Sequence, residues 1–293
     1  MGTVLKSVVR GFCPPYLWSL GKRILARRAP VAAAPHDAEW TYVPDGWKAG
    51  LRATAIRGWN AEGVAESLLR MWPAFLEMAG GTAPLSLSNE AVRTGRPDAG
   101  YHNTVMTFGY VLGLAGAGRT NVSMLDWGGS LGHYSLLARR LHPEMDLEYV
   151  CMDMPALAAA GRRVQPGVRF VSDEAECLDR GYDLVLASGS LHYVEDWQAL
   201  LAKLSRVATR HLFVTRVPVV QESASFVVLQ RPYRYGYGTE YLGWCLNREE
   251  FLASARRLGV RLVREFLVDE RIAIPGAPES AVYRGFLFDK GNE

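Results

Sequence analysis

The stretch Val122-Ser-Met-Leu-Asp-Trp-Gly-Gly-Ser-Leu-Gly-His-Tyr134 decides the fold. Its apolar run predicts a buried strand, its glycines predict a tight turn, and the residues that follow predict a helix. Glycine lets a ligand approach the backbone N–H groups at a helix start, and a β-carbon at Gly128 or Gly132 is expected to hold a cofactor away. A dinucleotide fingerprint would need glycine in place of Trp127, so the turn does not match the pattern for NAD.

Short apolar runs alternate with helical patterns after this stretch. Strands are predicted at 122–126, 147–153, 168–172, 182–188 and 211–217, and helices at 134–141, 155–164 and 197–207. A helix at 248–258 precedes two further strands, at 262–268 and 282–288, joined by a turn at 275–278. We expect an α/β protein with a doubly wound, mostly parallel, seven-stranded sheet. Its ligand crevice should lie at the turns after Leu125, Met152, Val171 and Ala187.

Three regions are expected along the chain. Residues 1–34 form a basic amphipathic segment with a linker, 35–118 form an N-terminal helical region for substrate binding or a lid, and 119–293 form the cofactor-binding core. The core carries an aromatic insert at about 221–246. Helices are predicted at 62–79, with a kink at Pro73, and at 103–114, with a long loop at 85–101 between them.

The segment at 1–34 permits two interpretations, because its apolar side chains alternate with clusters of Lys and Arg. It either packs Phe12, Tyr16, Leu17 and Trp18 onto the body of the protein or makes a transient peripheral contact with an anionic membrane surface. No run approaches the roughly 18 apolar residues of a membrane-spanning helix, and the features of a secretory signal are missing. The cytoplasm is the expected location, with the inner membrane surface as the alternative.

Composition excludes several classes of protein. The chain has 293 residues, of which 49% are hydrophobic, and this excludes a mainly disordered protein. A net charge of +3 is too small for the one-signed field of a non-specific nucleic-acid binder. The four cysteines, Cys13, Cys151, Cys177 and Cys245, form no C-x-x-C pair, so neither a metal site nor a disulfide framework is predicted.

The glycine turn also resembles a known motif. The spacing of Asp126, Gly128 and Gly132 is similar to the first motif of class I S-adenosylmethionine-dependent methyltransferases, which have a Rossmann-like fold. The resemblance implies that the acid faces the methionine amino group and that the turn lies along the methionine portion of the cofactor. The sequence departs from the commonest form at Ser130, where a third glycine is usual.

Three later turns fit the same family. The second predicted strand ends in Asp153, which stands 27 positions after Asp126, near the roughly 20-residue spacing of a carboxylate that binds ribose hydroxyls. The alternative for Asp153 is a helix N-cap. Asp153-Met154-Pro155 resembles the acid-Leu-Pro signature of small-molecule O-methyltransferases, and Asp173 stands where the family binds the adenine amino group. The resemblance covers about residues 120–217. It implies a cofactor site of Asp126, Gly128, Gly129, Ser130, Gly132, Asp153, Met154, Asp173, Glu174, Ser188 and Gly189.

The turn after the fourth strand is implied to pass close to the transferred methyl group. An alcohol acceptor needs a base, and His192 is the first candidate because an imidazole titrates near neutrality; His133 and His102 are the others. The alternatives are a hydrogen-bonding role in the pocket for His192 and a structural role for His133. Substrate contacts are expected from Tyr101, His192, Tyr193, Arg231, Tyr233, Tyr235 and Tyr237, with a packed lid as the alternative.

These residues predict an enzyme that transfers a methyl group from S-adenosylmethionine to an oxygen of a small molecule or sugar, with S-adenosylhomocysteine as product. The layout is similar to uncharacterised bacterial proteins regarded as methyltransferases and often associated with surface-polysaccharide gene clusters, which implies a glycan or lipid-linked sugar acceptor. The alternative is a methyltransferase-fold binding or scaffold protein without turnover. A nucleic-acid partner is disfavoured, because Ser188-Gly-Ser-Leu replaces an Asn-Pro-Pro-Tyr or Asp-Pro-Pro-Tyr motif. No oligomeric state follows from the sequence.

Overall fold

The computed structural model describes residues 39–53, 56–86 and 98–291. The segment predicted at 1–34, with both of its interpretations, lies outside these residues, as does most of the loop predicted at 85–101. Within the described ranges, no helix combines the length and the apolar character needed to cross a bilayer.

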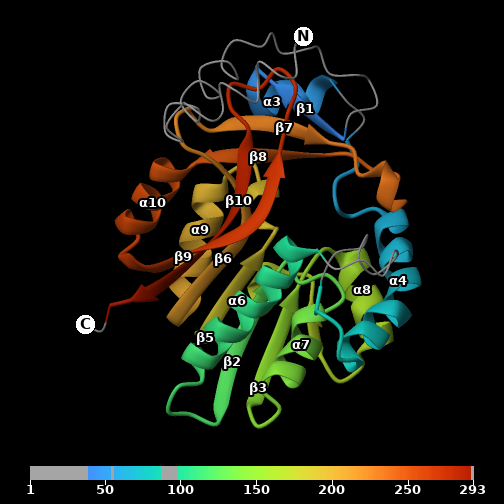
Figure 1. The fold of residues 1–293 in the computed structure, drawn as a ribbon, viewed down its shortest axis with the longest axis vertical. Coiled ribbons are helices and arrows are strands. Elements are labelled where there is room, and N and C mark those ends of the chain that lie inside the picture. The colour runs from blue at the N-terminus through green and yellow to red at the C-terminus, as the bar shows by residue number, and fades with distance from the viewer. Residues whose placement is uncertain (1–38, 54–55, 87–97, 292–293) are drawn as a thin grey trace, which may run out of the picture.

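A mostly parallel sheet forms the centre of the fold (Figure 1). Its strands are β2 (Asn121–Trp127), β3 (Asp146–Met152), β4 (Arg169–Val171), β5 (Tyr182–Ser188), β6 (Ala208–Val220), β9 (Val260–Ile272) and β10 (Ala281–Lys290). The first five are parallel and lie in the order β4-β3-β2-β5-β6. Strand β10 pairs antiparallel with β6, and β9 pairs antiparallel with β10. The predicted Rossmann-like core of seven mostly parallel strands is therefore present.

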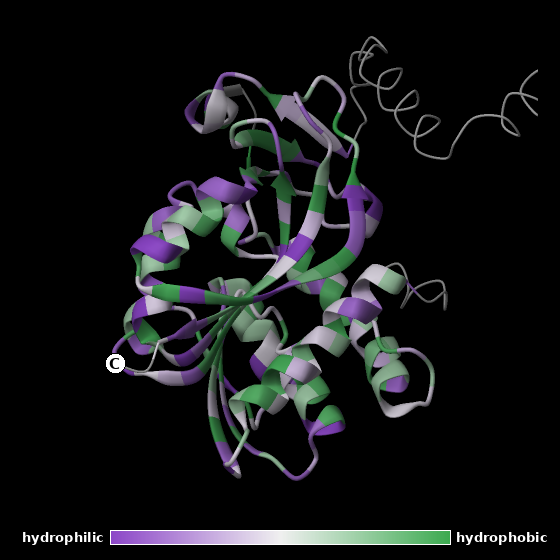
Figure 2. Cartoon of the chain, turned by 60° about the vertical axis from the view of Figure 1, so that its left-hand side comes forward, coloured by the Kyte–Doolittle hydropathy of each residue, from purple (hydrophilic) through white to green (hydrophobic). Residues whose placement is uncertain are grey.

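Helices cover both faces of this core. One face carries α4 (Glu62–Gly80), α6 (Ala99–Ala115), α7 (His133–Leu141) and α8 (Pro155–Val164), and the other carries α9 (Trp197–Val207) and α10 (Arg248–Arg257). Met124 packs in the first buried cluster and Leu125 in the second, because successive side chains of a strand point to opposite faces. Figure 2 shows the hydrophobic residues concentrated along the central strands.

A second group of strands, which the sequence analysis did not predict, extends the sheet beyond the core (Figure 1). It contains β1 (Trp40–Val43), β7 (Phe226–Gln230) and β8 (Tyr241–Asn247), next to helix α3 (Gly46–Ala53). Strand β8 runs parallel to the end of β6 at Val219 and Val220, β7 is antiparallel to β8, and β1 is antiparallel to β7. The aromatic insert therefore contains two strands, and the region 35–118 contributes a strand as well as helices.

One predicted boundary changes the environment of candidate residues. Helix α6 begins at Ala99 and not at 103, because the Asp98 side chain accepts a 3.0 Å hydrogen bond from the N–H of Tyr101 and caps the first turn. Tyr101 and His102 therefore lie in a helix, although a loop was predicted for Tyr101. Helix α4 continues through Pro73.

Candidate functional site

The turn between β2 and α7 needs glycine for its own packing. Gly128 and Gly132 have φ angles of 74° and 76°, in the left-handed region that other residues avoid. A β-carbon on Gly128 would lie 2.5 Å from Cβ of Ser190, and one on Gly132 would lie 2.8 Å from Nε2 of Gln165. A β-carbon at either position would therefore clash with the protein itself, and the expected effect on a bound cofactor stays a prediction.

Ser130 occupies a strained position in the same turn. Its φ angle is 58°, a conformation that favours glycine. Its backbone N–H donates a 2.6 Å hydrogen bond to Oδ2 of Asp153. Its hydroxyl is buried at the wall of a cavity, without a hydrogen-bond partner among the described residues. That hydroxyl therefore lacks the hydrogen-bond partner that a buried polar group normally has.

Asp126 lies beneath the turn. Its carboxyl is fully buried, and Oδ2 accepts a hydrogen bond from the hydroxyl of Tyr149. A β-carbon on Gly129 would lie 2.5 Å from this oxygen, so the turn closes tightly over the acid. Burial raises the pKa of Asp126 to about 7, with the Tyr149 hydrogen bond opposing the rise and the charge of Asp153 adding to it. The implied contact with a methionine amino group stays a prediction.

Asp153 is the acid that faces the cavity. Its Oδ2 accepts from Ser130, and its Oδ1 accepts a 2.7 Å hydrogen bond from the N–H of Met154. Burial raises the pKa of Asp153 to about 6, against the effect of these two hydrogen bonds. The N-cap of α8 is Met154, which removes the interpretation of Asp153 as the cap. Asp126 pairs with Cys151, two residues before Asp153, so the two carboxyls lie at the same edge of the sheet.

A cavity of about 530 Å³ lies at the carboxyl ends of β2, β3 and β5, where a doubly wound sheet places its ligand crevice. The predicted cofactor residues on its wall are Gly128, Gly129, Ser130, Asp153, Met154, Glu174, Ser188 and Gly189. The predicted catalytic and substrate residues on its wall are Tyr101, His133, His192, Tyr193, Tyr235 and Tyr237. Residues predicted from distant segments thus share one cavity.

Other predicted residues lie away from this wall: Asp126, Gly132, Asp173, His102, Arg231 and Tyr233. Asp173 caps the short helix η1 (Glu174–Glu176) by accepting a hydrogen bond from a backbone N–H. Arg231 and Tyr233 both donate to Oε1 of Glu240, at 2.8 and 2.7 Å. The aromatic and basic insert is therefore divided, with only part of it directed to the cavity.

Of the two histidines on the wall, His192 is buried and His133 is half-buried. Burial, together with the charge of Arg216, lowers the pKa of His192 to about 3. Neither ring nitrogen of His192 has a hydrogen-bond partner in the part of the chain that the structure describes. His133 packs edge-on against Trp72 and Phe75, and burial lowers its pKa to about 4. The expectation of a near-neutral pKa at His192 is therefore wrong. A hydrogen-bonding role of His192 in the pocket stays a prediction.

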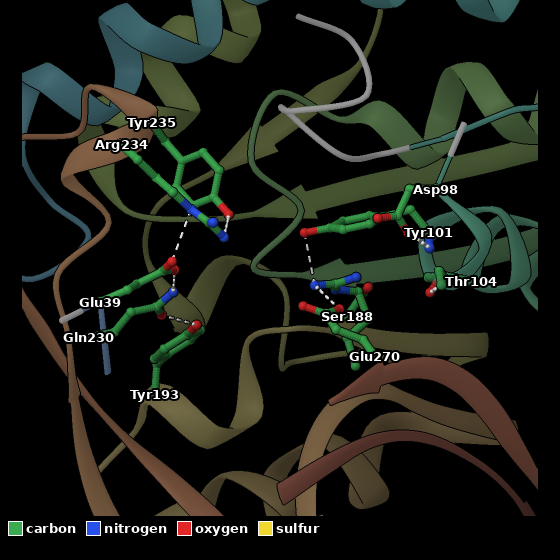
Figure 3. Close-up of polar contacts among 12 residues, drawn as sticks. Glu39, Asp98, Tyr101, Thr104, Ser188, Tyr193, Gln230, Arg234, Tyr235 and Glu270 are labelled. Atoms are coloured by element: carbon green, nitrogen blue, oxygen red, sulfur yellow. Dashed lines mark hydrogen bonds and ion pairs between the residues drawn. The ribbon is translucent and has the colours of Figure 1, made fainter. Parts of the chain in front are cut away.

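Arg216 lies on the wall and was not predicted. It donates a 3.0 Å hydrogen bond to the hydroxyl of Tyr101 and forms a 2.9 Å ion pair with Glu270. Figure 3 shows Tyr101 and Glu270 approaching each other from two different elements. The φ angle of Arg216 is 54°, and such strain clusters at functional sites. The signal in the sequence is a single charge inside the otherwise uncharged run 212–220.

An aromatic wall, defined as Trp59, Tyr193, Tyr235, Tyr237 and Tyr241, borders the cavity. Trp59 stacks on Tyr241 with 4.3 Å between ring centroids and meets Tyr193 edge-on at 5.2 Å. Such a wall provides flat apolar surface and excludes water. Trp59 was not predicted as a site residue, because only the tertiary fold brings it to Tyr193 and Tyr241.

A chain of polar contacts supports this wall (Figure 3). The Tyr193 hydroxyl donates to Oε1 of Gln230 at 2.8 Å, and Nε2 of Gln230 donates to Oε1 of Glu39 at 2.9 Å. Arg234 forms a 2.9 Å ion pair with the other oxygen of Glu39. The carboxylate of Glu39 is therefore engaged by the protein itself.

Comparisons with known proteins give similarity of fold. No family model matches the sequence, and a search of curated proteins finds no match. The structure is similar to magnesium protoporphyrin IX methyltransferase from Synechocystis, with 14% identity, a TM-score of 0.47, and coverage of 78% of this chain and 95% of that one. It is also similar to 1,6-didemethyltoxoflavin-N1-methyltransferase from Burkholderia thailandensis, with 17% identity, a TM-score of 0.44, and coverage of 78% of this chain and 89% of that one. A third similar structure is an S-adenosylmethionine-dependent methyltransferase from Clostridium acetobutylicum, with 11% identity, a TM-score of 0.45, and coverage of 69% of this chain and 96% of that one. Similarity of this degree identifies neither a reaction nor a substrate for this chain.

Proposed function

We propose that this chain is an S-adenosylmethionine-dependent methyltransferase that methylates an oxygen of a small-molecule acceptor. The observation that carries the proposal is the meeting of three strand-end turns on one cavity, represented by Ser130, Asp153 and Ser188. These turns come from three neighbouring parallel strands, so their geometry is set by the sheet and not by a single loop.

The residues at this end of the cavity fit the cofactor. The carboxylate oxygens of Asp153 each accept one backbone N–H and keep acceptor capacity for the two ribose hydroxyls. The free hydroxyl of Ser130 can bind a polar group, and Met154, which is 46% exposed, offers apolar surface to a flat base. When bound, S-adenosylmethionine supplies an electrophilic methyl group on a positively charged sulfur.

Glu174 is a better candidate than Asp173 for the adenine end. Glu174 lies on the cavity wall and is held by a 2.5 Å ion pair with Lys203. The carboxylate of Asp173 already accepts a hydrogen bond as a cap, and its side chain does not line the cavity. A substitution at Glu174 should therefore affect cofactor affinity more than one at Asp173.

The remaining wall suits a small acceptor. A cavity of about 530 Å³ has the size of a small-molecule site. If the acceptor were a glycan, only one of its sugar units would fit inside. Methyl transfer chiefly needs an oriented and dehydrated acceptor, and the aromatic wall can provide both. The chemistry asked of the protein is therefore positioning and exclusion of water.

Calorimetric titration of the full chain with S-adenosylhomocysteine tests the proposal, with Gly128→Val as a variant that should lose binding. We expect saturable one-site binding by the wild type, and its absence would contradict the proposal. Release of S-adenosylhomocysteine from S-adenosylmethionine in the presence of small-molecule extracts then tests turnover. Cofactor binding without turnover for any acceptor would favour the binding or scaffold alternative.

A further inference from the structure

Arg216 lines the cavity and carries a hydrogen-bond donor that no described residue engages. Its side chain is 13% exposed, and Nη2 is engaged by Tyr101 and Glu270. Nη1 is buried and has no hydrogen-bond partner among the described residues. A buried donor left free in the protein has a large desolvation penalty, which a ligand oxygen would remove.

This donor lies next to the turn on the cofactor side. A β-carbon on Gly189 would lie 3.8 Å from Nε of Arg216, and the N–H of Gly189 donates to the carbonyl of Thr215 at 2.9 Å. Arg216 also acts electrostatically on His192. The guanidinium therefore lies beside the turn after β5, and it lines the same cavity as the aromatic wall.

The other free polar atoms on the wall are mostly donors too. Nε1 of Trp59 and both ring nitrogens of His192 are buried without partners in the described part of the chain. Tryptophan and arginine only donate, and a neutral imidazole donates through one nitrogen. Two carboxylates on the cavity wall already form ion pairs within the protein: Glu270 with Arg216 and Glu39 with Arg234. The matching ligand carries more hydrogen-bond acceptors than donors, unlike a sugar with many hydroxyls.

The rings around Arg216 indicate the shape of the ligand. The guanidinium carbon lies 3.8 Å from the ring centroid of Tyr101 and 5.3 Å from that of Tyr283. Tyr101 and Tyr283 join the aromatic wall in lining the cavity. Flat aromatic surfaces at this density favour a planar ring over an aliphatic chain.

Building on the methyltransferase function proposed above, we propose that the acceptor is a planar ring compound with an acidic oxygen, such as a phenol or an aromatic carboxylic acid, and that Arg216 binds this oxygen as an anion. Glu270 balances the charge of Arg216, so the charge of the anion is balanced by the sulfonium of the cofactor. A guanidinium also favours ionisation of a phenol, whose pKa is about 10 in water.

Such an acceptor requires no proton acceptor from the protein. A lone pair of the ionised oxygen forms the new C–O bond, while the C–S bond breaks and its electron pair stays on sulfur. The negative charge on oxygen and the positive charge on sulfur cancel, and the proton has already left to water. His192 and His133, both weak bases, could not deprotonate a sugar hydroxyl efficiently.

The test uses protein saturated with sinefungin, a cofactor analogue that carries an amine in place of the methylsulfonium. Calorimetry compares 3,4-dihydroxybenzoate with its neutral counterpart 3,4-dihydroxybenzyl alcohol and with methyl α-D-glucopyranoside. We expect the acid to bind about tenfold more tightly than either neutral probe, the difference of a charge-assisted contact. Arg216→Gln should abolish this preference, and Arg216→Lys should retain part of it because the charge remains.

Arg256→Gln, at an exposed arginine on α10, is the matched control. It should change neither the affinity for 3,4-dihydroxybenzoate nor the affinity for the neutral probes. Sinefungin affinity is measured separately for every variant and also reports whether the cofactor end is folded. Equal binding of acid and neutral probes, no binding of the acid, or a preference that survives Arg216→Gln would overturn the inference while leaving the proposed function intact. Failure of wild-type protein to bind sinefungin would instead contradict the proposed function.

Discussion

The backbone N–H of Ser130 and the carboxylate of Asp153 join the glycine turn to the end of the neighbouring strand through a 2.6 Å hydrogen bond. The same carboxylate is the proposed ribose ligand. The shape of the turn and the affinity for the cofactor therefore depend on one side chain.

Asp153→Asn should weaken binding of S-adenosylhomocysteine about tenfold to a hundredfold, because hydrogen bonds to an ionised acceptor are worth about 1.5–3 kcal/mol. Calorimetry gives the dissociation constant. Asp146→Asn, at the exposed start of the same strand, is the control and should leave affinity unchanged. An unchanged affinity in Asp153→Asn would remove Asp153 from the cofactor site.

Ser130→Gly should raise the free energy of unfolding by about 1 kcal/mol, since glycine adopts a φ angle of 58° without the steric penalty of a side chain. Urea denaturation measures the change. Ser130→Ala keeps the strain and should show no such gain. Both variants should lower cofactor affinity to a similar degree if the free hydroxyl binds the cofactor, and a gain shared by both would disprove the strain.

Asp126 should make the protein less stable as pH rises. Burial raises its pKa from 3.8 to about 7, so the folded state holds a proton that the unfolded chain releases above pH 3.8. Stability is then lost between about pH 4 and 7, by up to about 1.4 kcal/mol per pH unit for this group. Asp126→Asn keeps an acceptor for Tyr149 and should flatten the decline in urea denaturation. A wild-type slope equal to that of the variant would show that Asp126 is ionised in the folded state.

His133 should act in the opposite direction at acidic pH. Burial lowers its pKa from 6.5 to about 4, so the unfolded chain takes up a proton below pH 6.5 that the folded state does not bind. Stability is lost as pH falls from about 6.5 to 4. His133→Phe keeps the ring contacts with Trp72 and Phe75 and should resist this loss. At about pH 8 the His133 imidazole is neutral in both the folded and the unfolded state. The difference in unfolding free energy between wild type and variant at that pH therefore gives the packing effect alone.

Helices and strands that depend on local sequence signals were predicted more accurately than those that depend on contacts between distant segments. Strand β5 and helices α8 and α9 were predicted with their observed ends, because apolar periodicity and Pro155 at a helix start are local signals. Strands β1, β7 and β8 were missed because they gain stability by pairing with one another and, for β8, with the end of β6. Helix α6 began earlier than predicted because its cap, Asp98, lay inside a stretch interpreted as a loop.

The amino-acid sequence by itself determined the parallel core, the glycine turn and the acids Asp126 and Asp153 at the ends of adjacent strands, because apolar periodicity and turn residues are local patterns. Only the tertiary structure decided which residues face the cavity. It buried Asp126 beneath the turn, lowered the pKa of His192 and brought Arg216 to Tyr101 and Glu270. Burial and long-range contact depend on how separate elements pack, and no window of sequence contains both partners.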